Sequence, residues 1–370
     1  MSRRKNRKAR RKQKREKPAI ELVDILTYKN LYIAARLSCK LIGWKLSVQR
    51  FLLSILFRLY QAKQDILSDI DIRQGFICFR IFERGKEREI QSLYFMERFI
   101  QKLICIFILL PLYRKSFIKE NSASQKGKGT LFASKTLEKH LREFLRKHGT
   151  GYIMLIDFSK YFENMNQDII TKFYNDNFLD ERLKSLLIKS VTAYEKGVGL
   201  GSEISQFNAI MYLNKIDHFI KSNFKYYGRY MDDSYIICED KEKLKNFSEI
   251  LFKKYEEIGI IVNKKKTKIL SLNKHFTFLK TRYKIIKNNK IIKKPSRESI
   301  TRNRKKFRKM VKLVLNGELT KEDLYRAFKS WAGSMKRRNA RKSVYKIRKE
   351  IDHALCLQSN DGRVLNDSTL

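Results

Sequence analysis

Hydrophobic residues recur at three- and four-residue spacing from Glu21 to about Ile70, and most of the intervening Lys and Arg residues fall on other faces. This spacing puts apolar side chains along one side of a helix. The pattern therefore predicts a helical N-terminal module that packs on the segment following it. The clearest members of the repeat are Leu41, Trp44, Val48, Phe51, Leu52 and Ile55.

After residue 71 the period changes to that of strands. Residues 75–82 and 88–90 are rich in aromatic and branched side chains, and Gly85 lies between them, so they predict a β-hairpin. Lys86 lies at its tip, and Arg88 lies on the same side of the second strand. A basic hairpin is most often a solvated edge, and it also suits a grip on a triphosphate.

Helical patterns and short strands alternate over the rest of the chain. The apolar run at 151–156 predicts a buried strand, after which 158–162 should lead into a helix, and 275–283 and 283–292 predict two more strands. This mixture predicts an α+β fold. Helices are expected at 92–118, 131–148, 168–195, 207–221, 241–258 and through most of the chain beyond 292.

Two loops have compositions suited to a ligand. Residues 121–130 combine two glycines with two lysines, which favours phosphate contacts, although the spacing of a nucleotide-binding P-loop is lacking. Residues 197–206 form a glycine-rich loop that opens the next helix. Its backbone amides can therefore approach a ligand closely.

Two adjacent aspartates, Asp232 and Asp233, lie between two runs of aromatic and branched residues at 226–238, with Gly228 just upstream. The pattern predicts a strand, a tight turn that carries the acids, and a second strand. Neighbouring carboxylates repel each other, and Mg²⁺ prefers hard oxygen ligands of this kind. An ordinary polar turn is the alternative, since Asp is a common turn residue.

A third acid, Asp157, ends the buried strand at 151–156. An acid in this place is costly unless it is paired or bound to a metal, although it could instead cap the next helix. Three acids, one at a strand end and two on a hairpin, are the minimum set for two divalent metals about 4 Å apart. They indicate in-line nucleotidyl transfer.

The charge of the chain indicates a polyanionic partner. Its 370 residues include 82 Lys and Arg against 38 Asp and Glu, which gives +44 and a pI near 10.1, while the 43% hydrophobic content fits a folded protein. Nucleic acid is the expected polyanion. An anionic membrane would require an exposed apolar face or an anchor, and the best apolar run, 103–112, is too short to span a bilayer. No membrane partner is therefore expected.

The five cysteines are scattered without a close pair, which argues against a zinc knuckle or a disulfide framework. We expect a reducing compartment and a cytoplasmic protein. Residues 1–18 form a basic tail that reads both as a disordered solubilising arm and as a non-specific phosphate contact.

The order of these motifs resembles that of reverse transcriptases over roughly residues 72–340. Asp157 falls in what looks like the first palm motif, and Tyr230-Met-Asp-Asp233 matches the family's signature tetrapeptide. The resemblance implies that Asp157, Asp232 and Asp233 bind two Mg²⁺ ions, or Mn²⁺, as catalytic metal ligands. It also implies an RNA template, a DNA or RNA primer and dNTPs.

Other site residues are implied by the same resemblance. Lys86 and Arg88 match the fingers residues that hold the incoming triphosphate, and Phe158 joins Phe162 in the nucleotide pocket. Phe162 stands where the family has an aromatic steric gate against the ribose 2′-OH. Lys266, within 263–267, is a candidate proton donor to pyrophosphate. The run 276–280 resembles the primer grip, with a lysine where a glycine is usual.

The glycine-rich loop departs from most relatives. Where many carry Pro-Gln-Gly, this chain has Gly199-Leu200-Gly201, followed by Ser205-Gln206. Leu200, Gly201 and Gln206 are expected to lie at the nascent base pair, and loss of a glutamine amide there predicts weaker base discrimination. The loop is similar to that of bacterial reverse transcriptases from diversity-generating retroelements, and an anti-phage enzyme fits it too. Either setting implies a dedicated non-coding RNA, and the first a small accessory protein.

The resemblance implies a right-hand polymerase with fingers, palm and helical thumb that makes cDNA from a structured non-coding RNA. The alternatives are a catalytically idle RNA-binding protein and an untemplated nucleotidyl transferase of the same fold. The expected divisions are a tail at 1–18, a helical module at 19–70, fingers at 71–150, a palm at 151–285 with an insertion near 165–195, and a basic thumb and tail at 286–370.

Overall fold

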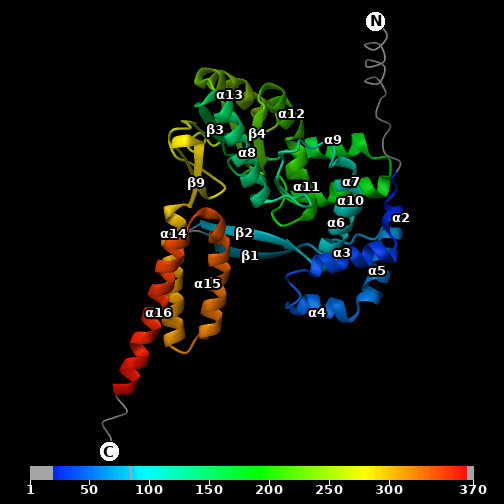
Figure 1. Ribbon diagram of the computed structural model, residues 1–370. Coiled ribbons are helices and arrows are strands. Elements are labelled where there is room, and N and C mark those ends of the chain that lie inside the picture. The colour runs from blue at the N-terminus through cyan, green and yellow to red at the C-terminus, as the bar shows by residue number, and fades with distance from the viewer. Residues whose placement is uncertain (1–19, 84–85, 365–370) are drawn as a thin grey trace, which may run out of the picture. The chain divides into compact units, whose positions relative to one another are not determined.

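The computed structural model describes residues 20–83 and 86–364 (Figure 1). Helices and antiparallel strand pairs together confirm the predicted α+β fold. The basic tail predicted at 1–18 lies outside the described residues. No helix in 20–83 or 86–364 has the length and apolar character that a membrane span needs.

The described residues divide into two compact units. Unit 1 holds the segments up to Ala133, Ile156–Tyr235 and Lys245–Thr267. Unit 2 holds Ser134–Leu155, Ile236–Leu244 and the chain from Lys268 onward. Each is described by itself.

Unit 1 begins with the helical module that the periodicity predicts. Val48 and Phe51 are buried as expected, whereas Leu41 and Trp44 are 87% and 74% exposed. These two residues precede α4 in a turn, so they do not continue its apolar face. The helices of the module are α2 (Leu22–Ile25), α3 (Tyr28–Cys39), α4 (Leu46–Leu53) and α5 (Ile55–Leu67).

The predicted hairpin is confirmed: β1 (Phe76–Glu83) pairs with β2 (Lys86–Leu93) in antiparallel register. Helical structure follows, as predicted, and residues such as Phe99 and Ile108 are buried in it. The elements here are α6 (Phe95–Ile104), the π-helix η1 (Cys105–Leu109) and α7 (Leu110–Tyr113).

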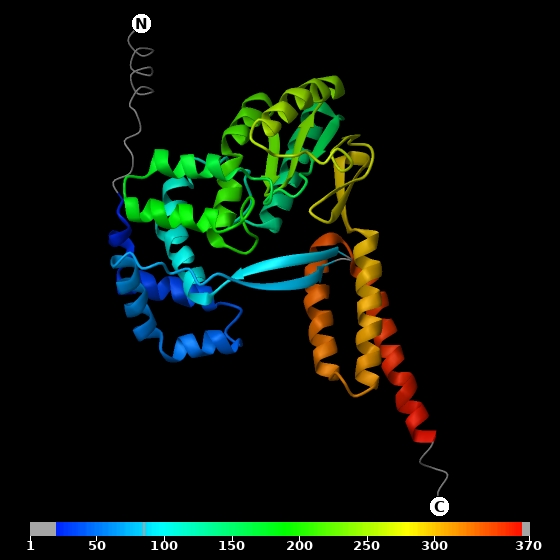
Figure 2. The same cartoon turned by 180° about the vertical axis from the view of Figure 1, so that it is seen from behind.

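Four further helices of unit 1 lie close together in both views of the ribbon (Figure 2). Residues 158–162 precede a helix, as expected. The chain turns at 159–165, and the helix begins at Gln167 because the Asn166 side chain accepts hydrogen bonds from the amides of Asp168 and Ile169. These helices are α9 (Gln167–Asn177), α10 (Glu181–Thr192), α11 (Glu203–Tyr212) and α12 (Asn214–Asn223).

A four-stranded sheet has the order β4-β5-β3-β6. β6 pairs antiparallel with β3 and was not predicted, because its four residues, Lys268–Ser271, follow a lysine-rich run and are too few to show a period. The other strands are β3 (Tyr152–Ile156), β4 (Tyr226–Tyr230) and β5 (Asp233–Cys238), and α13 (Lys241–Glu256) follows β5.

Unit 2 contains α8 (Thr130–His148) from Ser134 onward and a three-stranded antiparallel sheet in the order β7-β8-β9. Leu279 and Lys280 form the turn between β7 and β8 with φ of 46° and 60°. This left-handed conformation favours glycine, which explains why a glycine is usual at the position of Lys280. The strands are β7 (Phe276–Phe278), β8 (Thr281–Ile286) and β9 (Lys290–Pro295), with a 3₁₀ turn, η2 (Lys287–Asn289), between the last two.

Three helices of unit 2 pack around an aromatic core in which Phe307, Phe328 and Trp331 make tilted and edge contacts at 5.5–5.8 Å. This arrangement confirms the predicted C-terminal helices. They are α14 (Arg297–Leu315), α15 (Lys321–Met335), which ends in the 3₁₀ turn η3 (Lys336–Arg338), and α16 (Arg341–Val364).

The five cysteines differ in exposure. Cys78 in β1 and Cys356 in α16 are exposed, whereas the other three are buried. Burial raises the pKa of Cys39, Cys105 and Cys238, so their reactive thiolate form is disfavoured.

Candidate active site

The aspartate hairpin has the predicted form. β4 ends at Tyr230, Met231 and Asp232 make the turn, and β5 begins at Asp233. Met231 has a φ of 53°, a left-handed conformation that is unfavourable for a residue with a Cβ atom. The turn carries Asp232 and Asp233 as adjacent, half-buried carboxylates.

Asp157 follows β3 directly, and backbone hydrogen bonds fix its place. The amide of Asn263 donates to the Asp157 carbonyl oxygen at 2.8 Å, and the Asp157 amide donates to the Thr267 hydroxyl at 3.3 Å. One residue pair further on, the Ser159 amide donates to the Ile261 carbonyl oxygen at 2.8 Å. The segment that contains Lys266 therefore aligns along the Asp157 turn.

Lys266 and Asp157 form an ion pair, with the ammonium nitrogen 3.0 and 3.2 Å from the two carboxylate oxygens. Burial raises the pKa of Asp232, and repulsion from Asp157 adds to the effect. Burial, followed by repulsion from Asp232 and Asp157, raises the pKa of Asp233 to about 7, although Lys266 opposes it. The structure thus brings the three predicted acids and the predicted lysine into one electrostatically coupled site.

The donor chemistry of this site fits a divalent cation. Asp157, Asp232 and Asp233 offer only hard carboxylate oxygens, and their mutual repulsion is what a bound cation relieves. Within residues 20–83 and 86–364, no group of three or more His, Cys, Asp and Glu side chains is arranged so that it could hold a metal ion. We therefore take the three aspartates as candidate ligands on their chemistry alone.

Phe162 lies five residues after Asp157 and is half-buried. Its carbonyl oxygen accepts a hydrogen bond from the Val198 amide at 2.9 Å, which joins it to the glycine-rich loop. The ring of Phe158 is buried and packs on Tyr161 at 5.4 Å. Any contact of Phe158 with a nucleotide is therefore through its backbone.

The glycine-rich loop ends earlier than predicted, because the Ser202 hydroxyl caps α11 and the helix begins at Glu203. Gln206 therefore lies on a helix, where its side-chain oxygen accepts a hydrogen bond from the Ser124 hydroxyl at 3.2 Å. Leu200 is 39% exposed, and Gly201 has a φ of 97°, which requires glycine. The loop thus presents Leu200 outward.

Comparison with protein families decides the identity. The model of the reverse transcriptase (RNA-dependent DNA polymerase) family matches residues 83–283, more than half of the chain. The chain belongs to the reverse transcriptase family. A comparison with curated protein sequences finds no match.

Two solved structures are similar to this reverse transcriptase. One is apo telomerase from Candida tropicalis truncated from its C-terminal domain, at 14% identity and a TM-score of 0.46 over 59% of this chain and 54% of that one. The other is apo telomerase from the same organism, at 16% identity and a TM-score of 0.43 over 59% and 47%. The reverse transcriptase spans about half the length of these two chains.

The backbone of Lys86 and Arg88 lies in β2, paired with Glu83 and Ile81. The side chains of both residues lie outside what the structure describes. Their predicted role in holding the triphosphate of a reverse transcriptase substrate therefore stays a prediction.

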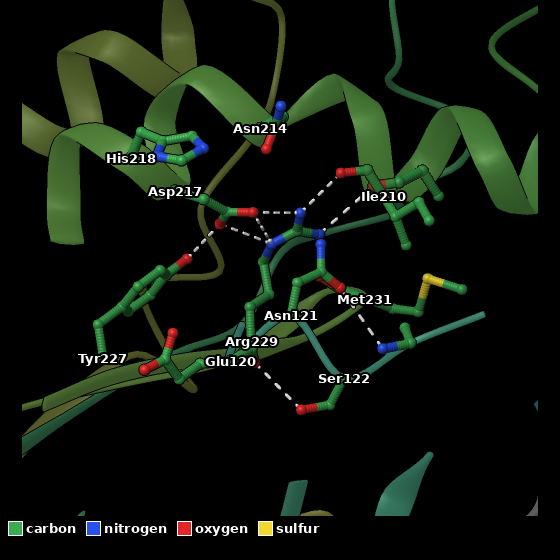
Figure 3. Close-up of polar contacts among 12 residues, drawn as sticks. Glu120, Asn121, Ser122, Ile210, Asn214, Asp217, His218, Tyr227, Arg229 and Met231 are labelled. Carbon is green, nitrogen blue, oxygen red and sulfur yellow. Dashed lines mark hydrogen bonds and ion pairs between the residues drawn. The ribbon is translucent and has the colours of Figure 1, made fainter. Parts of the chain in front are cut away.

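Sequence reasoning missed a buried polar network beneath the hairpin. Arg229 and Tyr227, on the same face of β4, both bond Asp217 of α12 (Figure 3). A signal was present in the sequence. Arg229 is the one charged residue of β4, whose other residues are tyrosines and Gly228, and a charged residue at an inward position of a strand needs a buried partner.

Proposed function

We propose that this chain is an RNA-directed DNA polymerase that works by metal-assisted nucleotidyl transfer. One observation carries the proposal: Asp157, Asp232 and Asp233 form a single coupled set of carboxylates, with the pKa of Asp233 raised to about 7. In a protein of this family, such a set at a strand end and a hairpin tip is suited to two divalent cations. Mg²⁺ is the proposed ion, and Mn²⁺ an alternative.

When bound, the cations would supply charge neutralisation and a lower pKa for the attacking hydroxyl. The primer 3′-oxygen forms a bond to the α-phosphorus of the dNTP, and the bond from that phosphorus to pyrophosphate breaks. Asp157, Asp232 and Asp233 would hold these cations, since three carboxylates on their own would repel the anionic triphosphate. Lys266, whose ammonium lies beside Asp157, gives a proton to the departing pyrophosphate, and the hydroxyl proton goes to solvent.

Substrate selection is assigned to two neighbouring features of unit 1. Phe162 closes the sugar side of the pocket against a ribose 2′-OH. Leu200 and Gly201 border the nascent base pair without an amide side chain, and Gln206 of α11, bonded to the Ser124 hydroxyl, lies beside them in the proposed pocket. Lys86 and Arg88 complete the pocket as ligands of the triphosphate.

The biological setting proposed is a bacterial diversity-generating retroelement or a phage-defence system, in which a structured non-coding RNA is copied into cDNA. The formal charge of +44 supports a nucleic-acid partner. We also propose the division into fingers at 71–150, palm at 151–285 and thumb at 286–370. The helix α14 of the proposed thumb carries the basic residues Arg297, Arg302, Arg304, Lys305, Lys306, Arg308, Lys309 and Lys312.

The test is sequencing of the RNA and DNA that co-purify with the protein from its host, beside an Asp232→Asn/Asp233→Asn control. A discrete non-coding RNA, with complementary DNA that is absent from the control, is expected. Bound RNA without DNA in either sample would instead indicate an idle RNA-binding protein. DNA without a complementary RNA would indicate untemplated synthesis.

A further inference from the structure

An ion pair lies fully buried beneath the aspartate hairpin. The side chains of Arg229 and Asp217 are 0% and 1% exposed, and the guanidinium bonds both carboxylate oxygens, with the shortest contact at 2.6 Å (Figure 3). Moving two charges from water into the protein interior costs free energy that can exceed the attraction between them. A buried ion pair is therefore not by itself expected to stabilise the fold. Its place in the fold therefore calls for another explanation.

Each member of the pair lies at the end of a helix whose backbone dipole favours its charge. Arg229 donates to the Ile210 carbonyl oxygen at 2.9 Å and to that of Ala209 at 3.4 Å, in the last turn of α11. Asp217 lies in the first turn of α12. A cation at a helix C-terminus and an anion at a helix N-terminus are both favoured by the backbone dipoles.

The Arg229 guanidinium stays protonated at any ordinary pH. Burial by itself lowers the pKa of the guanidinium, but the adjacent Asp217 carboxylate outweighs it, and the pKa lies above its usual value. The Tyr227 hydroxyl donates to Asp217 at 2.6 Å, which fixes the carboxylate from a second side. Hydrogen bonds therefore hold both side chains of the Arg229–Asp217 pair in place.

The Arg229–Asp217 pair contacts the turn that carries Asp232 and Asp233. Arg229 also donates to the carbonyl oxygen of Met231 at 3.1 Å, and Met231 is the residue held in the left-handed conformation. The two residues after Met231 are Asp232 and Asp233. The Tyr161 hydroxyl, four residues after Asp157, donates at 2.7 Å to the Ala209 carbonyl oxygen that Arg229 also contacts.

We propose that Arg229, oriented by Asp217, is a positioning residue for the polymerase reaction. It holds the Met231 carbonyl and so directs the Asp232 and Asp233 carboxylates toward a common divalent cation. This proposal rests on the proposed function, and it adds a role for two residues that touch neither the cation nor the substrate.

The experiment compares full-length Arg229→Lys with a double variant, Asp217→Leu/Arg229→Met. Lysine keeps the charge but has one ammonium group, which cannot reach Asp217, Ile210 and Met231 together. The double variant replaces the buried pair by apolar side chains of similar size, a change that is often neutral for folding. Each is measured for kcat and KM of dNTP incorporation, and for the shift in the thermal unfolding midpoint on addition of MgCl₂ or MnCl₂.

Both variants are expected to unfold in one cooperative transition, with kcat at least about ten-fold lower and KM for dNTP within about two-fold. The cation-induced shift of the midpoint should also fall. Unchanged kcat and an unchanged shift in Arg229→Lys would overturn the proposal. If the double variant does not fold, Arg229→Lys still decides the outcome on the same measurements.

Lys221→Met is the matched control. It breaks another ion pair of unit 1, between Lys221 and Glu120 at 2.7 Å, and is expected to lower stability without changing kcat. The cation-induced shift needs no turnover. An inactive wild-type protein would therefore contradict the proposed function, while the shift would still test the positioning role.

Discussion

The ammonium nitrogen of Lys266 lies 3.0 Å from one carboxylate oxygen of Asp157 and 3.2 Å from the other. The Lys266 ammonium thus neutralises the charge of Asp157, one of the three proposed metal ligands. Its side chain is 63% exposed, so it can leave Asp157 when a divalent ion arrives. The same lysine would then be available for the departing pyrophosphate.

Lys266→Met should therefore have two opposite effects. Removal of the competing charge should lower the half-saturating Mg²⁺ concentration by a few-fold, while loss of the proton donor should lower the rate at saturating Mg²⁺ by about 100-fold. Single-turnover incorporation across a Mg²⁺ titration measures both. Lys265→Met, an exposed neighbour, is the control and should behave as wild type. An undiminished rate for Lys266→Met would rule out the proton-donor role.

The raised pKa of Asp233 predicts a pH dependence of stability. Between about pH 4 and pH 7 the unfolded chain loses a proton that folded Asp233 keeps, so the free energy of unfolding falls as pH rises, by roughly 2–4 kcal/mol from this group. Above about pH 7 this contribution of Asp233 to the free energy of unfolding no longer changes with pH. Urea unfolding at pH 5 and pH 8 should show this loss in wild type and a smaller one in Asp233→Asn.

Asp176→Asn, an exposed acid of α9, serves as the control and should retain the wild-type pH dependence. Mg²⁺ should restore stability to the wild-type protein at pH 8 and do so weakly at pH 5, because the cation needs the ionised carboxylate. Equal stabilisation at both pH values would contradict the assignment of Asp233 as a metal ligand.

Phe162→Ala should relax sugar selection. Its ring is the proposed barrier to a ribose 2′-OH, so the ratio of kcat/KM for dNTP over NTP should fall by about ten-fold or more. Phe162→Tyr keeps the ring and should keep the selectivity. Incorporation of matched dNTP and NTP pairs opposite one template base measures the ratio. An unchanged preference for dNTP in Phe162→Ala would refute the steric role.

Leu200→Gln should improve base discrimination. The variant restores an amide beside the nascent base pair, and one added hydrogen bond of about 1 kcal/mol corresponds to roughly a five-fold drop in misincorporation. Leu179→Gln, at another exposed leucine, provides the control. Deep sequencing of cDNA made from a defined template gives the error rates, and equal rates for Leu200→Gln and wild type would sink the hypothesis.

The sequence predicted those parts of the fold and the candidate site that depend on local pattern. The aspartate hairpin, the strand that ends at Asp157 and the N-terminal helices all have a clear period of their own. The acids came together as expected because each ends or interrupts an apolar strand. Nothing local marks β6, whose pairing with β3 joins residues more than a hundred positions apart.

The Asp217–Arg229 pair was missed for a related reason. Arg229 was visible as a charged residue within a strand, but its partner lies on α12, and a local period does not show which strand residue a helix residue will meet. The turn at 159–165 was not predicted, because no hydrophobic period marks it and the start of the next helix is set by the Asn166 cap.

The uneven exposure of the cysteines allows two dyes to be attached to the native sequence for a distance measurement by energy transfer. A thiol-reactive probe should label Cys78 in β1 and Cys356 in α16 while sparing the three buried thiols, whose pKa values are raised. One of these sites belongs to unit 1 and the other to unit 2. A donor and an acceptor dye on the native sequence would therefore test, molecule by molecule, whether the distance between these two sites changes when RNA, primer and dNTP are added.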